Sequence, residues 1–310
     1  RSGRALEPHL AAAMPALDLC AAALTLLQAL PAGAGRDAKA GAELLKLLSS
    51  LLASFSLTSS LPETMAISPM ATLRSVSVGN GSCYILQLKP RQRWKSDYVL
   101  MFDCGSQQFL DAGKRSVLPT LENLNIRQID CLMLSHADID HYGGVLDVAD
   151  GVRIKQVLLP QHMLDDAQAN PRKATANLLK GLEARQIPIH VVHAGWTHAY
   201  QEHAMQLIWP PAQSEFPVER HNDSSLVLSV QTHGRRILLN GDIQQRAITA
   251  MLDRNLNLKA DITDLAHHGS IVKATPDWLR AVNPEIAIQS AGWSRLYGDR
   301  DKWPALFEQT

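Results

Sequence analysis

Two histidines and two aspartates lie within the short segment "SHADIDHYGG", residues 135–144: His136, Asp138, Asp140 and His141. Imidazole and carboxylate groups are the ligands of zinc, manganese and iron hydrolases. The alternation at 136, 138 and 140 projects successive side chains to the same side of an extended loop. Because so dense a set of ligands destabilises a protein unless a cation neutralises it, the segment predicts a metal centre rather than a loop of solvated acids and ordinary histidines.

The neighbouring residues indicate how this cluster is held. The apolar run "IDCLML", residues 129–134, is typical of a buried strand and delivers the cluster at its C-terminal end. In open α/β architectures, side chains at that end of a strand converge in a crevice. Gly143 and Gly144 then permit a tight turn into the next helix.

The chain from residue 71 to 310 alternates between strand and helix patterns and predicts one mixed α/β domain. A hairpin-like turn signal, "GNG" at 79–81, separates the first two strand patterns. Strand patterns cover 73–78, 83–88, 98–102, 129–134, 154–159, 187–192, 205–209, 225–230, 236–239 and 285–290. Helical patterns cover 115–125, 174–186, 243–253 and 276–282.

Residues 1–70 differ in composition and are predicted to form an Ala/Leu-rich helical segment, either a linker or the remnant of a membrane-proximal part. The stretch 11–30 approaches membrane-spanning length, but Asp18 and Pro15 weigh against a span. The stretch 42–57 is amphipathic. It would suit packing on a partner or a membrane surface, and equally a plain helical pair.

Bulk composition excludes some classes of protein. Of the 310 residues, 46% are hydrophobic, which is enough for a sizeable core. Thirty Lys and Arg balance thirty Asp and Glu, so no overall field attracts nucleic acid or an anionic membrane. The four cysteines lack C-x-x-C spacing and are predicted to be buried apolar residues rather than a disulfide framework or a zinc ribbon.

The segment 135–144 resembles the metal-binding signature of metallo-β-lactamase fold hydrolases, in the variant where an aspartate replaces the second histidine of H-x-H-x-D-H. The resemblance extends over most of residues 73–293, through "SVGNGSCYIL", "MFDCGS", the hairpin that ends in "LLNGD", and "DLAHHGS". This combination is most similar to the extracytoplasmic hydrolase domain of the competence protein ComEC family. It implies a four-layer αββα sandwich, preceded by a short helical segment that could be membrane-associated.

The resemblance also implies a ligand set for two divalent metal ions, Zn or Mn. His136 and Asp138 belong to one site, Asp140 and His141 to the other, and Asp242 bridges both. Asp140 is also expected to be catalytic.

Two further positions complete the implied set. In the "HHGS" motif, His268 is favoured as the remaining ligand of the second site, and His267 as a catalytic residue that supports the ligand or contacts substrate. Either His221 or Asn222 fills a further ligand position.

Without the resemblance, these residues have ordinary explanations. Asp242 in "NGD" is typical of a turn. The "HHGS" motif could cap a helix or a turn. Asp103 in "FDCG" is as consistent with an Asx turn at a strand end as with support of a metal ligand.

Two ions about 3.5–4 Å apart would lower the pKa of a shared solvent molecule and supply hydroxide for in-line attack. Asp138 makes the ligand set harder and more anionic. Manganese is therefore a candidate metal as well as zinc, and hydrolysis of a phosphodiester is favoured over hydrolysis of a lactam. We therefore expect a phosphodiesterase or nuclease that acts transiently on DNA in competence-type DNA uptake, with no nucleotide cofactor. Local basic segments that could contact DNA are 89–95, 113–115, 171–173 and 234–236.

Two alternatives remain open at this point. One is a metallo-hydrolase of a small ester, lactone or phosphocholine-type substrate, and the other is a non-catalytic module that binds DNA or a partner. The resemblance implies membrane association through residues 1–70 and an extracytoplasmic hydrolase domain; a cytoplasmic location is the alternative.

Overall fold

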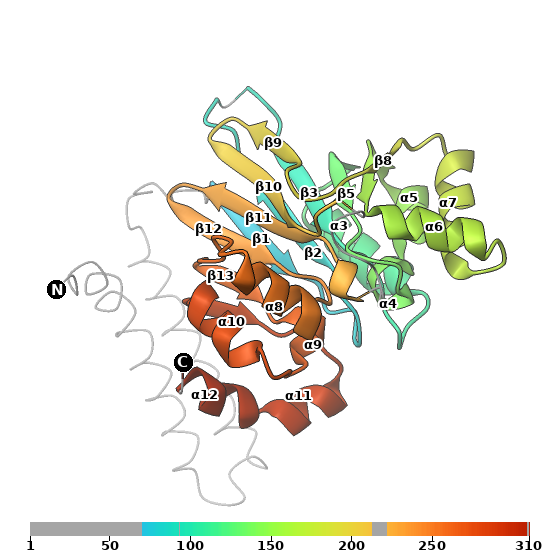
Figure 1. Cartoon of the computed structure of the whole chain (residues 1–310). Helices are drawn as coiled ribbons and strands as arrows, with labels where there is room; N and C mark the ends of the chain where they lie inside the picture. The colour runs from blue at the N-terminus through green and yellow to red at the C-terminus, as the bar shows by residue number, and fades with distance from the viewer. Residues whose placement is uncertain (1–69, 93, 213–221, 309) are drawn as a thin grey trace, which may run out of the picture. The chain divides into compact units, whose positions relative to one another are not determined.

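The computed structural model describes residues 70–92, 94–212, 222–308 and 310 (Figure 1). The helical segment predicted for residues 1–70 lies outside this range, apart from residue 70. Among the described helices, none is both long and apolar enough to cross a membrane.

The first sheet has six strands in the order β1-β2-β3-β5-β7-β8. Neighbours β1, β2 and β3 are antiparallel, and the pairs from β3 to β8 are parallel. Their bounds are β1 (Ala71–Ser75), β2 (Tyr84–Leu88), β3 (Tyr98–Phe102), β5 (Cys131–Met133), β7 (Val157–Leu159) and β8 (Ile189–Val191). A separate pair joins β4 (Gln128–Ile129) to β6 (Arg153–Ile154).

The second sheet also has six strands, in the order β14-β13-β12-β11-β10-β9. The pairs from β9 to β12 are antiparallel, and those from β12 to β14 are parallel. The bounds are β9 (Thr197–Tyr200), β10 (His203–Trp209), β11 (Val227–Thr232), β12 (Arg235–Leu239), β13 (Ile262–Asp264) and β14 (Ile286–Ile288).

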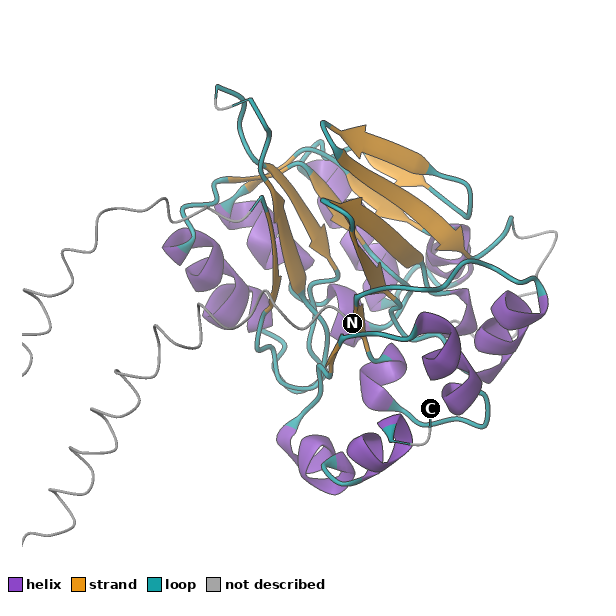
Figure 2. Ribbon diagram, turned by 90° about the vertical axis from the view of Figure 1, so that its left-hand side faces the viewer, coloured by secondary structure: helices purple, strands orange, loops and turns teal. Residues whose placement is uncertain are grey.

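Helices cover the outer faces of the two sheets, which face each other in Figure 2. The first sheet packs on η2 (Gly113–Val117), α3 (Leu118–Asn123), α5 (Val145–Gly151), α6 (Gln161–Ala169) and α7 (Ala174–Ala184). The second packs on α8 (Gln245–Asp253), α10 (Thr275–Val282) and α12 (Lys302–Phe307). Three short helices, α4 (Ile139–Tyr142), η3 (Asn222–Ser224) and α9 (Ala266–Gly269), lie near the candidate site, and α11 (Trp293–Asp299) precedes α12.

The strand sequences fit this layering because successive side chains point to opposite faces of a sheet. In β3, Tyr98, Leu100 and Phe102 pack between the two sheets, whereas Val99 and Met101 pack on the helical side. Both faces of such a strand are buried, which explains why the strands read as continuous apolar runs. The predicted α/β class and four-layer αββα sandwich are confirmed.

Some boundaries differ from the predicted ones. The run 129–134 is divided, because the carboxylate of Asp130 turns back to accept a hydrogen bond from Val99 N at 2.9 Å and ends the short strand β4. The run 154–159 divides likewise into β6 and β7. Strands β9 and β13 and helix α6 were not predicted. Cys83, Cys104 and Cys131 are buried and free.

Candidate metal centre

The segment 135–144 follows β5 after Leu134 and includes α4. His136 and His141 are fully buried. The backbone carbonyl of Asp140 accepts a hydrogen bond from Ser82 N at 3.0 Å, and that of His141 accepts one from Cys104 N at 2.7 Å. Two loops of the first sheet therefore hold the ligand segment by its backbone.

The close approach of these loops requires glycine. A Cβ atom on Gly105 would lie 2.6 Å from His141 N, and one on Gly81 would lie 2.8 Å from Asp140 O. Real Cβ atoms do not approach backbone atoms so closely. The glycines of "GNG" and "FDCG" thus fit the loops against the ligand segment.

The second sheet contributes Asp242, which follows β12 and is almost fully buried. Its backbone N–H donates to Ser225 Oγ at 3.1 Å. Gly241 before it has φ +52°, and a Cβ there would lie 2.7 Å from the Ser135 Cβ. The two sheets therefore meet at this point, which brings Asp242 to the histidines of the first sheet.

The remaining histidines follow β13 in α9. His267 and His268 both have left-handed backbones, with φ of 50° and 55°. The backbone N–H of His267 donates to Gly241 O at 3.0 Å. This unusual turn directs two consecutive imidazoles toward Asp242.

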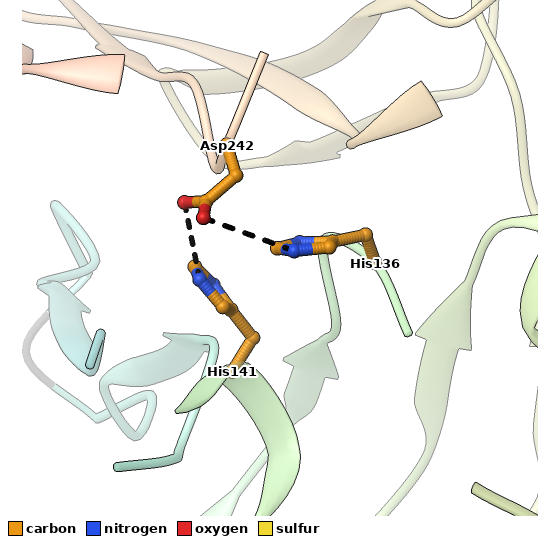
Figure 3. Close-up of side chains that lie close together, drawn as sticks. All are labelled: His136, His141 and Asp242. Atoms are coloured by element: carbon orange, nitrogen blue, oxygen red, sulfur yellow. Dashed lines mark ion pairs between the residues drawn. The ribbon is translucent and has the colours of Figure 1, made fainter. Parts of the chain in front are cut away.

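Asp242 lies among the imidazoles, as Figure 3 shows for two of them. Its Oδ1 is 3.1 Å from His141 Nε2, and its Oδ2 is 3.9 Å from His136 Nε2 and 3.5 Å from His268 Nε2. Asp140 Oδ2 is 3.3 Å from His268 Nε2. One carboxylate thus faces three imidazoles that come from both sheets.

Within the described residues, two groups of donor atoms at this place are close enough to hold a cation: His136, His141 and Asp242, and Asp140, His141 and His268. His141 belongs to both groups. The ligand sets implied by the resemblance differ in part from these two groups, because they assign His141 to one site only.

Asp138 lies 3.3 Å from His136 Nε2, but its side chain is 47% exposed and it is in neither group. His221 lies outside the described residues, and Asn222 is the first residue of η3.

The hydrogen bonds made by the Nδ1 atoms fix the tautomer of three imidazoles. His141 Nδ1 donates to Asp103 Oδ2 at 2.7 Å, and His268 Nδ1 donates to Ser290 O at 2.8 Å. Ser135 Oγ donates its proton to Asp103 Oδ2 at 2.8 Å, so His136 Nδ1, at 2.9 Å from the same hydroxyl, must be the donor to it. Each neutral ring then presents the lone pair of Nε2 to the centre.

His267 has the opposite arrangement. Its Nδ1 accepts a hydrogen bond from Gln244 Nε2 at 2.6 Å, so the proton of the neutral ring is on Nε2, which lies 3.7 Å from Asp242 Oδ2. His267 is therefore a hydrogen-bond donor at the edge of the centre, whereas His268 has the form of a metal ligand.

A metal ion fits this donor set. The Nε2 atoms of His141 and His268 are buried and have no hydrogen-bond partner in the described part of the chain. Lone pairs that face carboxylate oxygens at 3.1–3.5 Å are unfavourable unless a cation lies among them. Imidazole nitrogen with carboxylate oxygen suits zinc, manganese and iron.

The electrostatics of the carboxylates agree with a cation site. Burial opposes ionisation of Asp242, but the charges of His141, His136 and His268 outweigh it and hold the pKa of the carboxyl well below its usual range. Burial likewise opposes ionisation of Asp140, and His268 and His141 lower its pKa. The hydrogen bond with His136 lowers the pKa of Asp138.

In the metal-free chain, protons take the place of the cation. Burial disfavours the charged forms of His141 and His268, but Asp242 and Asp103 raise the pKa of His141 well above its ordinary value, and Asp140 and Asp242 raise that of His268. Burial lowers the pKa of His267. The centre therefore exchanges protons for metal as pH rises.

The residues that support the ligands were only partly foreseen. Asp103 is fully buried, and besides His141 it accepts a hydrogen bond from Ser135 N at 2.7 Å. It therefore orients a ligand, and it also has a turn-like backbone with φ 59°. Ser135 and Ser225 gave no signal in the sequence, because a lone serine beside a motif is compatible with any role.

The described residues of the segment 222–225 support other parts of the centre, and the ligand assignment at 221 or 222 stays a prediction. Asp223 Oδ1 accepts hydrogen bonds from Gln244 N at 2.9 Å and Ala247 N at 3.1 Å, at the start of α8. Its carbonyl accepts one from Trp209 Nε1 at 2.7 Å. The described part of the segment thus holds α8 and, through Ser225, Asp242.

The basic segments lie in different places. Segment 89–95 connects β2 to β3 at the ends of those strands remote from the centre, and 234–236 is likewise at the far end of the β11–β12 hairpin (Figure 1). Several cations pair with carboxylates: Lys114 with Asp147, Lys173 with Asp166, and Arg235 with Asp261 and Glu285. Of the four segments, the described residues of 89–95 and 234–236 therefore lie away from the centre.

An αββα sandwich with a His/Asp centre where its two sheets meet defines the metallo-β-lactamase fold. The model of the metallo-beta-lactamase superfamily matches residues 76–165, and the described domain has the corresponding fold. Members of that superfamily are generally metal-dependent hydrolases.

The predicted similarity to the ComEC family is also confirmed. The chain is 26% identical over 185 residues to ComE operon protein 3 of Bacillus subtilis (strain 168). This aligned region covers 60% of this chain and 23% of that protein. It is 26% identical over 209 residues to competence protein ComA of Neisseria gonorrhoeae, which covers 64% of this chain and 25% of that protein. The matches thus span about a quarter of these relatives' length.

Comparison with solved structures finds matches at low identity. The metallo-beta-lactamase fold protein YhfI from Bacillus subtilis is 12% identical, with a TM-score of 0.46, over 77% of this chain and 93% of that one. An archaeal metallo-beta-lactamase superfamily protein from Sulfolobus tokodaii is 15% identical, with a TM-score of 0.41, over 69% of this chain and 86% of that one.

Proposed function

We propose that this chain is a metal-dependent phosphodiesterase of the nuclease type, which cleaves DNA in competence-type DNA uptake. The observation that carries the proposal is the convergence of three Nε2 lone pairs, from His136, His141 and His268, on the buried carboxylate of Asp242. The similarity to proteins of bacterial competence supports DNA as the substrate.

The proposed ligands are the three Nε2 atoms together with the carboxylates of Asp138, Asp140 and Asp242. Bound divalent ions would activate a water molecule and neutralise the developing charge on a phosphoryl oxygen. The carboxylates make the set anionic, which suits manganese as well as zinc.

The surrounding residues would perform the other parts of the reaction. Asp103 and Ser135 hold His141 and His136 in the ligating tautomer. His267, through its Nε2–H, would donate a hydrogen bond to a phosphoryl oxygen next to Asp242. Ser225 fixes the backbone of Asp242, so that its carboxylate stays among the three imidazoles.

The test combines metal content with activity. Elemental analysis of the purified chain should find about two metals per chain, and hydrolysis of bis-p-nitrophenyl phosphate and single-stranded DNA should require added manganese or zinc. Asp140→Ala should lose metal and cleavage. Asp277→Ala, on an exposed ion pair of α10, should retain both. Absence of bound metal and of metal-dependent cleavage would refute the proposal and favour a non-catalytic binding module.

A second candidate function, hydrolysis of a small ester, lactone or phosphocholine-type substrate, is favoured by one observation. A pocket of about 260 Å³ lies beside Ser224, next to the residue that holds Asp242. It is lined mainly by apolar groups, including Pro160, Val192 and Pro210. If the chain hydrolyses p-nitrophenyl esters but leaves DNA intact, this second function replaces the first.

We further propose that residues 1–70 attach the domain to a membrane and that the domain lies outside the cytoplasm, as the similarity to ComEC implies. The amphipathic pattern of 42–57 supports attachment. The full chain should float with phospholipid vesicles, and Leu48→Lys with Leu52→Lys should abolish flotation. If the parent chain and the double variant float to the same extent, the proposed membrane attachment is contradicted.

A further inference from the structure

A second, shallow pocket of about 530 Å³ shares no lining residue with the pocket beside Ser224. Three segments form its walls: Asn80 from the loop after β1, Gln107 and Gln108 from the loop after β3, and 292–295 at the start of α11. Its volume is within the range of ordinary ligand sites.

Each wall of this pocket is tied to a candidate metal ligand. Asn80 is two residues from Ser82, whose N–H bonds Asp140 O, and Gln107 is three residues from Cys104, whose N–H bonds His141 O. Gly292 is two residues from Ser290, whose carbonyl accepts from His268 Nδ1. Since consecutive Cα atoms are 3.8 Å apart, every wall begins within about 11 Å of one of these contacts.

The third wall carries an exposed aromatic ring and a cation. Trp293 is 80% exposed. Tyr297 is 69% exposed and follows at i+4 on the same face of α11. Arg295 lies between them in sequence, and its guanidinium hydrogen-bonds Ser270 Oγ, two residues beyond His268. The exposed indole of Trp293 therefore offers a flat face on which another ring can stack.

The other two walls carry amides. Asn80 Nδ2 donates to Gln107 Oε1 at 2.7 Å, which orients both side chains. Asn80 Oδ1 then offers an acceptor and Gln107 Nε2 a donor. One acceptor and one donor beside an aromatic face are the groups that bind the edge and the face of a nucleobase.

We propose that this pocket holds a nucleotide of a single-stranded nucleic acid next to the bond to be cleaved, with its base stacked on Trp293 and its phosphate at Arg295. The inference rests on the proposed function, because it names a binding site for the substrate strand next to the metal centre.

Charge around α11 agrees with such an occupant. Arg300 lies over the Tyr297 ring at 5.7 Å, and Lys302 follows. Asp299 is shared by Arg295 at 3.6 Å and Lys302 at 2.9 Å, so one carboxylate serves two cations. Asp301 pairs with Arg300 at 3.2 Å. The face is mildly cationic, so binding depends more on stacking than on charge.

The test is binding of an uncleaved strand, measured by fluorescence anisotropy with the full chain in EDTA. The probes are fluorescein-labelled (dT)12, the same length of (rU)12, and an abasic strand. Trp293→Ala should weaken binding of (dT)12 about 5- to 150-fold, as loss of one stacked base does. Trp293→Phe should restore most of it.

The matched control is Trp94→Ala. Trp94 is 82% exposed but belongs to the loop remote from the centre, so its removal should leave binding unchanged. Arg295→Gln should reduce the slope of log affinity against log salt by about 0.7, the value for one phosphate contact on a single strand. If the parent binds (rU)12 as tightly as (dT)12, the pocket recognises the base and the phosphate of the nucleotide and does not distinguish its sugar.

Two results would overturn the inference: Trp293→Ala binds (dT)12 as tightly as the parent, or the parent binds the abasic strand as tightly as (dT)12. Either can occur while metal-dependent DNA cleavage persists, which would leave the proposed function intact. Conversely, Trp293-dependent binding without metal-dependent cleavage would support the pocket and refute the nuclease.

Discussion

Replacement of Asp103 by asparagine separates orientation of a ligand from the ligand itself. Asp103 Oδ2 accepts hydrogen bonds from His141 Nδ1 at 2.7 Å and from Ser135 Oγ at 2.8 Å, while Oδ1 accepts from Ser135 N at 2.7 Å. In asparagine, one of these oxygens becomes an NH₂ group. If the remaining oxygen stays with Ser135 N, the NH₂ faces two donors.

The expected result follows from the tautomer of His141. To avoid the opposed donors, the ring must accept at Nδ1 and carry its proton at Nε2, where a metal would bind. Loss of a buried hydrogen bond to a charged group costs about 1.5–3 kcal/mol. That agrees with the 10- to 100-fold loss of metal affinity, or about 1.4–2.7 kcal/mol, typical when the residue behind a ligand is replaced.

Asparagine is the right substitution because Asp103 has φ 59°, a conformation that Asn tolerates and Ala does not. Metal affinity is measured by competition with a chromophoric chelator. The control is Asp130→Asn, a buried aspartate at the other end of β3 that accepts from Val99 N at 2.9 Å. It should lower stability without changing metal affinity. Unchanged affinity in Asp103→Asn, with a lower melting temperature in both variants, would refute the assigned role.

Three further predictions concern the same centre. His268→Ala should reduce the metal content by about one ion per chain, whereas His267→Ala should keep the content and slow hydrolysis, by elemental analysis and steady-state kinetics. Gly105→Ala should destabilise the fold by about 1–3 kcal/mol and weaken metal binding, because its Cβ would lie 2.6 Å from the ligand backbone; Gly298→Ala, with open space around it, should do neither in thermal unfolding. Burial raises the pKa of Asp264 from 3.8 to about 7. The folded chain therefore keeps a proton that the unfolded chain releases, and stability of the metal-free chain should fall by up to about 4 kcal/mol between pH 4 and 7, a dependence that urea unfolding should find flattened in Asp264→Asn.

The strand and helix patterns of the sequence predicted the α/β class, whereas the resemblance implied the four layers and most of the ligand set. Ligand residues follow strands, and the continuous apolar run of β3 indicates burial on both faces. The density of acids and imidazoles in 135–144 cannot be explained by packing. Asp242, by contrast, gave only a turn signal, and its place in the centre depends on Gly241 lying against Ser135.

What the sequence did not predict depends on contacts between distant segments. The choice between His267 and His268 is made by Gln244 and by the carbonyl of Ser290, neither of which belongs to a recognisable motif. Asp223 carried no prediction, and only its contacts with Gln244 N and Ala247 N show that its carboxylate holds the start of α8. Periodicity cannot reveal which side of a turn an atom faces.

The backbone of the centre suggests why these contacts are retained. Asp103, His267 and His268 are non-glycine residues with left-handed φ, and each such residue costs about 1 kcal/mol or more. His268 offers a lone pair to the centre and His267 offers a hydrogen-bond donor. Asp103 orients His141, which offers a lone pair. Metal binding can offset this cost only in the folded chain, since the unfolded chain lacks the converged lone pairs. Metal should therefore raise the melting temperature of the parent more than that of Asp103→Asn, and an equal shift in both would show that the strained turn serves packing instead.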